Sequence, residues 1–156
     1  MTGSQIQGGD KVIEAARAAH EKHWRSTSDE STGDKQASQV TKVWQSAVKS
    51  EDVQVEVSIA DDLNERIDVV DFSTATAYEM KVSGKNPHHE FYRDIFKVVV
   101  YNQRYPDKKL ERLVFLTEGC GVKKLNGGLG EAVQAIINAD VQYGFQVAVV
   151  SVRDCR

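Results

Sequence analysis

The stretch "RIDVVDFSTATAYEMKVS", residues 66–83, decides the fold of this chain. Its two halves are rich in apolar and β-branched residues, so we predict strands over residues 66–72 and 76–83. Ser73 and Thr74 lie at the centre of the polar segment between them, which predicts a turn. Pairing the two strands across this turn gives an antiparallel hairpin.

Three charged side chains lie on these predicted strands, where a charge is costly unless it is paired or bound to a metal. A hairpin centred between residues 73 and 74 sets Val70 opposite Ala77 and Asp68 opposite Glu79. Directly opposed residues of an antiparallel pair share one face of the sheet. Lys81 follows Glu79 by two residues and therefore lies on the same face.

A convergence of Asp68, Glu79 and Lys81 suits phosphate chemistry assisted by a metal. Two carboxylates that close repel each other, and Mg²⁺, for which Mn²⁺ is expected to substitute, relieves the repulsion by taking their oxygens as ligands. The backbone carbonyl of Met80 can add a third ligand. Lys81 can orient a water molecule or stabilise charge that develops on phosphate. The alternative is a surface salt bridge between Lys81 and Glu79 or Asp68.

Hydrophobic periodicity outside the hairpin predicts an α/β protein with a mixed central β-sheet flanked by helices. Helical spacing covers residues 10–25, 36–49, 88–104 and 125–144, and further strands cover 53–60, 110–119 and 145–152. The predicted order is α-α-β-β-β-α-β-α-β. We expect residues 1–156 to form a single domain, with a helical extension and loop over 1–35 and the core over 36–156.

The composition is that of an ordinary globular protein, with 40% apolar and 28% charged residues in 156. No apolar run approaches the roughly 18 residues of a membrane span, and the N-terminus lacks the features of a signal peptide. We therefore expect a cytoplasmic protein that does not bind membranes. Cys120 and Cys155 have no motif spacing and are expected to be free thiols.

The charge is distributed unevenly along the chain, although the net value is only −3. Residues 1–80 hold 8 basic and 15 acidic side chains, whereas residues 81–112 hold 8 basic and 4 acidic ones. The positive charge thus follows the hairpin acids directly. This pattern predicts a basic surface beside an acidic pocket, which suits a polyanion bound through a metal.

The hairpin resembles the core of the PD-(D/E)XK nuclease superfamily, which has the restriction-endonuclease-like fold. That family has an Asp at the start of the second core strand and the pattern E/D-x-K on the third, and Asp68, Glu79 and Lys81 match these positions. Its core order, α-β-β-β-α-β, resembles residues 36–117. The resemblance implies a restriction-endonuclease-like core and Mg²⁺-dependent hydrolysis of phosphodiester bonds.

The chain departs from the family pattern at two points. Ile67 stands where the nominal pattern has Pro. Many members carry a Glu on the first core helix, whereas residues 36–49 hold no acid. Glu30, Asp34 or Glu14 would have to supply that carboxylate from the flank, so the number of metal ions stays open.

The helix predicted over 88–104 carries candidate substrate-binding residues. His89, Arg93, Lys97 and Tyr101 follow each other at intervals of four, which predicts one basic stripe with an aromatic residue. Exonuclease-like branches of the superfamily place Gln-x-x-x-Tyr on this helix, and Lys97 and Tyr101 resemble that spacing. The alternative is a solvated helix face.

These observations predict a nucleic-acid hydrolase, and the leading hypothesis is a DNA endonuclease. An RNA- or tRNA-cleaving toxin domain of the same superfamily, which would need an inhibitor protein, is the second hypothesis. The third is a non-catalytic nucleic-acid-binding subunit. A chain of this length that cuts two strands would act as a homodimer or within a larger complex.

Overall fold

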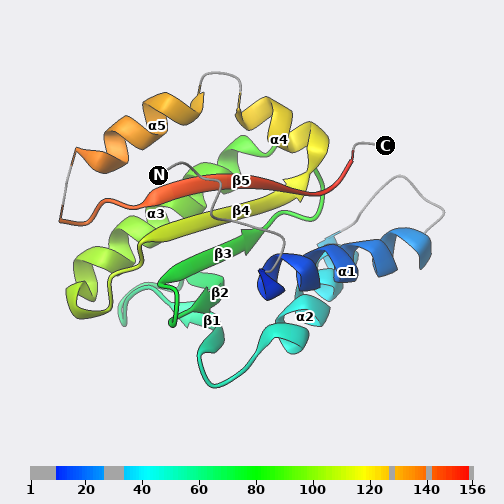
Figure 1. Ribbon diagram of the computed structural model, residues 1–156, viewed down its shortest axis with the longest axis horizontal. Helices are drawn as coiled ribbons and strands as arrows, with labels where there is room; N and C mark the ends of the chain where they lie inside the picture. The colour runs from blue at the N-terminus through cyan, green and yellow to red at the C-terminus, as the bar shows by residue number, and fades with distance from the viewer. Residues whose placement is uncertain (1–9, 27–33, 127–128, 140–141, 155–156) are drawn as a thin grey trace.

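A five-stranded mixed sheet forms the centre of the protein (Figure 1). The computed structural model describes residues 10–26, 34–126, 129–139 and 142–154. Across the sheet the strands lie in the order β1 (Val53–Ser58), β2 (Arg66–Asp71), β3 (Thr76–Met80), β4 (Arg112–Glu118) and β5 (Gln146–Arg153). Strands β1 and β2 pair antiparallel, as do β2 and β3, whereas β4 pairs parallel with β3, and β5 with β4.

Helices cover both faces of the sheet (Figure 1). One face is covered by α1 (Lys11–Ser26) and α2 (Asp34–Val48), and the other by α3 (His88–Arg104), α4 (Gly119–Leu125) and α5 (Leu129–Asn138). A 3₁₀ turn, η2 (Pro106–Lys108), follows α3. Within the described ranges no helix combines the length and the apolar character needed to cross a bilayer.

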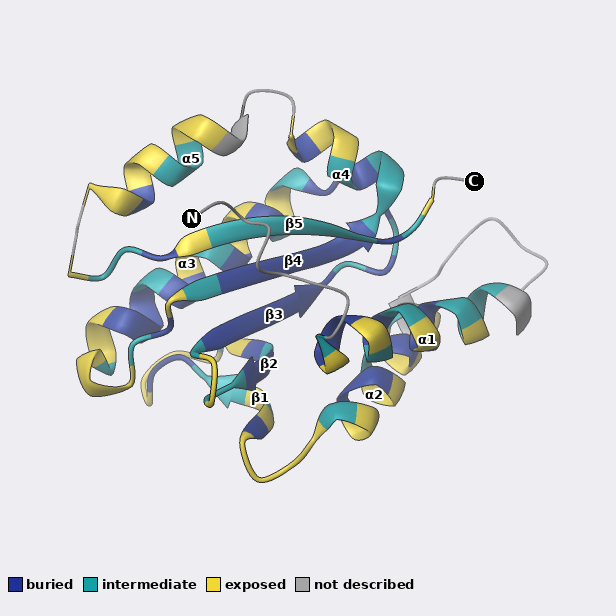
Figure 2. Cartoon of the chain, in the orientation of Figure 1, coloured by how far each residue is buried: buried dark blue, intermediate teal, exposed yellow. Residues whose placement is uncertain are grey.

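Alternation along β3 separates the two hydrophobic layers. Tyr78 and Met80 pack in the cluster formed with α1 and α2, whereas Ala77 packs in the cluster formed with α3. All residues of β3 are buried, as are the central residues of β4 (Figure 2). Because β4 lies between two parallel neighbours and under helices on both faces, its sequence is almost continuously apolar.

Helix α1 belongs to the main hydrophobic core, although the sequence places it in an N-terminal extension. Val12, Ile13 and Ala16 are buried against the sheet. The indole Nε1 of Trp44 donates a hydrogen bond to the carbonyl of Val12 at 3.0 Å, which ties α2 to α1. Cys120 is a free thiol, and Cys155 lies outside the described residues.

The predicted elements are found within a few residues, with two exceptions in the C-terminal part of the chain. Helix α4 was not predicted, and the helix predicted over 125–144 is shorter, because α5 ends at Asn138. Two glycines lower the helix propensity of α4, but packing favours it. A Cβ on Gly121 would lie 3.1 Å from the Cα of Gly84, so the missing side chain allows α4 to rest on the segment after β3.

Candidate active site

The β2–β3 hairpin brings Asp68 and Glu79 together. Val70 pairs with Ala77 and Val69 with Tyr78, which confirms the predicted register. The backbone N–H of Asp68 donates to Glu79 Oε1 at 3.2 Å, and the N–H of Met80 donates to Asp68 Oδ2 at 3.1 Å. Each carboxylate therefore accepts an amide from the opposite strand, at the point where the backbone ladder ends.

Lys81 follows β3 directly and lines the same pocket as the two acids. Its backbone N–H donates to the carbonyl of Leu116 at 2.9 Å, which extends the pairing with β4 and fixes the position of Lys81. The Lys81 ammonium lies 3.6 Å from Glu90 Oε1 on α3. The ion-pair partner of Lys81 is thus Glu90, instead of Glu79 or Asp68 as the salt-bridge alternative expected.

Helix α3 adds an ion pair that the sequence did not predict. Lys97 Nζ lies 3.0 Å from Glu79 Oε1 and 3.1 Å from Asp94 Oδ1. Glu79 is 3% exposed, and Asp94 and Lys97 are each 6% exposed. Spacing could have indicated Asp94, because it precedes Lys97 by three residues and so lies on the same side of the helix.

Burial and mutual repulsion shift the ionisation of this cluster. Burial raises the pKa of Glu79 well above its ordinary value, and the nearby Asp68 and Asp94 carboxylates raise it further. Burial also raises the pKa of Asp68, and it raises the pKa of Asp94 to about 7. Burial lowers the pKa of Lys97, but the carboxylates of Glu79 and Asp94 outweigh it, so Lys97 stays charged.

An open polar pocket of about 370 Å³ surrounds these residues. It lies between the end of the hairpin, the β1–β2 connection and α3. Six acids and four basic residues line it: Glu56, Glu65, Asp68, Glu79, Glu90, Asp94, Arg66, Lys81, Arg93 and Lys97. The lining therefore carries an excess of two negative charges when all groups are ionised, which favours a divalent cation.

Besides the acids of α3, one further acid near the site, Glu56, comes from β1. The pairing of Val55 with Val69 and of Val57 with Ile67 places Glu56 beside Asp68. Glu56 has a left-handed backbone with φ of 50°, which interrupts the regular strand. Its position in the alternating strand, at the register opposite Asp68, could have indicated it.

Helix α2 contributes an amide where the family pattern often has an acid. The buried side chain of Gln45 donates to the carbonyl of Asp68 at 3.0 Å and to Glu56 Oε1 at 3.2 Å. Of the three candidate acids named from the sequence, Glu14 is exposed and pairs with Arg17 at 2.8 Å. Glu30 and the side chain of Asp34 lie outside the described residues.

The predicted stripe on α3 does not form one surface. His89 is exposed and lies outside the pocket lining, Arg93 lines the pocket, and Lys97 is buried in the ion pair. Tyr101 is 3% exposed and packs in the core, with its ring 4.9 Å from that of Tyr105. Residues spaced by four are rotated by about 40° per step around a helix. After the three steps from His89 to Tyr101, the side chain therefore faces the core instead of solvent.

The basic segment predicted from the sequence is partly neutralised by ion pairs in the folded chain. Arg93 pairs with Glu65 at 2.8 Å, and Arg104 pairs with Asp62 at 2.9 Å. Both acids belong to the β1–β2 connection, in the acidic half of the sequence. The surface beside the pocket is therefore a mixture of charges.

The donor set fits a divalent cation held by few protein ligands. Among the residues that the structure describes, no three His, Cys, Asp or Glu side chains form a ready metal cage. Mg²⁺, however, is usually bound by one or two carboxylates together with water. Asp68 and Glu79 supply two carboxylates, and burial raises the pKa of both, a cost of ionisation that a bound cation would offset.

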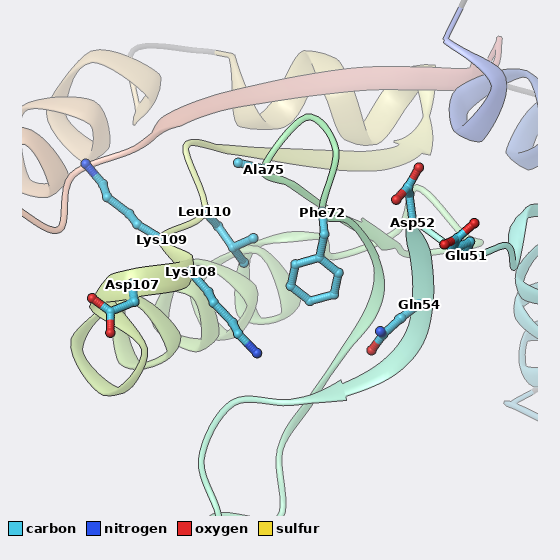
Figure 3. A pocket seen from close by; sticks show the side chains of 9 residues that line it. All are labelled: Glu51, Asp52, Gln54, Phe72, Ala75, Asp107, Lys108, Lys109 and Leu110. Carbon is cyan, nitrogen blue, oxygen red and sulfur yellow. The ribbon is translucent and has the colours of Figure 1, made fainter.

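A second pocket of about 490 Å³ lies at the other end of the hairpin (Figure 3). Phe72 and Ala75 of the turn contribute to it, with Asp52 from the β1 side and Lys108 from η2. Figure 3 shows Lys108 and Lys109 on one wall, and Glu51 and Asp52, which precede β1, on another. No predicted site residue lines this pocket.

Comparison of the chain with protein-family models, with curated proteins and with solved structures finds no match. The geometry of the site therefore carries the functional argument.

Proposed function

We propose that this chain is a metal-dependent nuclease with a restriction-endonuclease-like core, which hydrolyses phosphodiester bonds of DNA as an endonuclease. The observation that carries the proposal is the pairing of Asp68 with Glu79 across the hairpin, with Lys81 next to them in one open pocket. The element order supports it as well, because the antiparallel β1–β3 unit is followed by α3 and by a parallel β4.

The proposed roles follow from the chemistry of each group. Asp68, Glu79 and the Met80 carbonyl would hold Mg²⁺ or Mn²⁺. A cation bound there would supply Lewis-acid activation of the phosphoryl group. The Lys81 ammonium would donate a hydrogen bond to the attacking water or to a non-bridging phosphate oxygen, with the 3′ oxygen as the leaving group. Glu90 keeps Lys81 beside the pocket without the close contact that would block it.

Cleavage of supercoiled plasmid and of total RNA tests the proposal, with Mg²⁺, Mn²⁺ or EDTA present. We expect the wild-type protein to nick plasmid with Mg²⁺ and to be inactive in EDTA. Lys81→Met and Asp68→Asn should each lower the rate by about 10²–10³-fold, the effect of removing one stabilising group from an active site.

Lys85→Met is the matched control, because Lys85 is an exposed lysine four residues beyond Lys81. It should retain wild-type activity. If the protein cleaves RNA but not plasmid DNA, the result would support the alternative of an RNA-cleaving toxin domain. Absence of any metal-dependent cleavage, or full activity in Lys81→Met and Asp68→Asn, would contradict it.

A further inference from the structure

The ammonium group of Lys97 lies between the buried carboxylates of Glu79 and Asp94 and offsets their negative charge. We propose that Lys97 is a built-in counter-ion of the metal site, which neutralises Glu79 when no divalent cation is bound and moves to Asp94 alone when one binds. This inference rests on the proposed function. It assigns to Lys97 a positioning role that sets the affinity of the site for its cation.

The contacts of Lys97 support such an exchange. Its ammonium lies 3.0 Å from Glu79 Oε1 and 3.1 Å from Asp94 Oδ1, so it is shared almost equally between two carboxylates. Asp94 is on the same helix, three residues earlier. The Lys97 side chain can therefore release Glu79 by a small rotation, and its ammonium group stays paired with Asp94.

The charge of the cluster also favours the exchange. Asp68, Glu79 and Asp94 carry three negative charges when ionised, and Lys97 carries one positive charge. The remaining two negative charges match one divalent cation. Because Lys97 and the cation both interact with Glu79 and repel each other, the lysine must weaken cation binding.

Substitutions at two neighbouring positions should therefore act in opposite directions. Lys97→Met removes the competing charge and should tighten Mn²⁺ binding by about tenfold or more. Asp94→Asn leaves the ammonium to Glu79 alone and should weaken binding by a similar factor. Lys97→Arg keeps the charge and should retain an affinity close to that of the wild-type protein.

Mn²⁺ binding to the full chain, measured by electron paramagnetic resonance, is the test, with Mg²⁺ calorimetry as a second measurement. Circular dichroism establishes that each variant is folded. If Lys97→Met does not fold, Lys97→Gln replaces it, because the amide can still donate to Glu79 without a charge. If Lys97 served only the folding of the protein, every substitution at this position would weaken Mn²⁺ binding.

The outcomes separate this inference from the proposed function. Tighter binding by the uncharged Lys97 variants supports the counter-ion role, including the case in which only those variants bind Mn²⁺ measurably. If the wild-type protein binds Mn²⁺ and Asp68→Asn abolishes binding, but neither Lys97→Met nor Lys97→Gln tightens it, the counter-ion role is wrong and the metal site stands. If no variant binds Mn²⁺, both proposals fail.

Discussion

At the scale of single residues, the buried carboxylate of Glu79 is expected to lower the stability of the fold, although the proposed activity requires it. Its buried carboxylate accepts hydrogen bonds from the Asp68 amide and from Lys97, and it lies among other acids. A bound divalent cation would offset the cost of ionising this buried carboxylate. Stability is often lost at such functional positions.

Glu79→Gln is expected to stabilise the protein in EDTA at pH 8 while it abolishes nuclease activity. Because the pKa of Glu79 is raised, the folded state binds more protons than the unfolded state, and stability falls as the pH rises above the unfolded pKa. The amide removes this cost, and Lys97 retains Asp94 as its partner. We expect a gain of about 1–2 kcal/mol in urea unfolding at pH 8, and a smaller one at pH 5.

The matched control is Glu111→Gln, at an exposed glutamate, which should change the unfolding free energy by less than about 0.5 kcal/mol. A Glu79→Gln variant that is less stable than the wild-type protein at pH 8 would show that the ion pair with Lys97 outweighs the repulsion.

At the scale of elements, the hairpin was predictable and α4 was not. Alternation fixes which residues of a strand share a face, so the meeting of Asp68 and Glu79 followed from the turn centre alone. The fit of α4 against the loop after β3 depends on two glycines 37 positions apart, Gly84 and Gly121, and local propensity cannot reveal it. Gln45 reaches the site because α2 packs against the sheet, and local sequence patterns do not predict that contact either.

Gly121→Ala should destabilise the protein by about 1–3 kcal/mol, the usual cost of overpacking. The added Cβ would lie 2.8 Å from Thr117 Cγ2 and 3.1 Å from the backbone of Gly84, so α4 must move away from the segment after Lys81. Urea unfolding measures the loss. Lys124→Ala, at an exposed position of the same helix, should change stability little, and an equal loss there would contradict the packing argument.

The contact of α1 with the end of β3 should make stability depend on pH near 6. His20 is 1% exposed, and its Nε2 lies 3.0 Å from the Val82 carbonyl. Burial lowers the pKa of His20 below 6.5, although the Val82 carbonyl and Glu118 oppose this shift, and His23 and Arg153 add to it. The folded state therefore resists protonation, so the His20 contribution is complete above pH 6.5 and is lost as the pH falls towards the folded pKa.

His20→Gln does not titrate and can still donate to the Val82 carbonyl. The wild-type protein should lose stability relative to this variant between pH 7.5 and pH 5.5, measured by urea unfolding at both values. Parallel pH dependence in the two proteins would exclude His20 as the cause.

At the scale of the whole molecule, folding rearranges the charge that the sequence separates. The acids of the β1–β2 connection lie against the arginines of α3, so the basic segment forms no uniform basic surface. Charge counts along a chain predict a surface only when neighbours in sequence are neighbours in space. Here the pocket lining stays acidic, so we expect the polyanion of the proposed function to approach closely only after a cation has bound.

DNA binding should consequently depend on a divalent cation. We expect a labelled duplex to bind at least about tenfold more weakly in EDTA than in Ca²⁺, which binds carboxylates and often does not support cleavage. Fluorescence anisotropy measures both affinities. In EDTA, Asp68→Asn should bind DNA more tightly than the wild-type protein, because it removes a negative charge. Equal affinity of the wild-type protein with and without Ca²⁺ would contradict the prediction.

The two hydrogen bonds from strand amides to Glu79 and Asp68 affect how conservation of these acids in related proteins should be interpreted. The amides of Asp68 and Met80 donate to the two carboxylates just beyond the last paired residues of the hairpin, Val69 and Tyr78. Under the proposed function, a descendant that had lost catalysis would still need a hydrogen-bond acceptor for each of these two amides. Conservation of these two acids in related proteins would therefore be weak evidence for enzymatic activity. Conservation of Lys81 would be stronger evidence, because its side chain accepts no hydrogen bond from a strand amide.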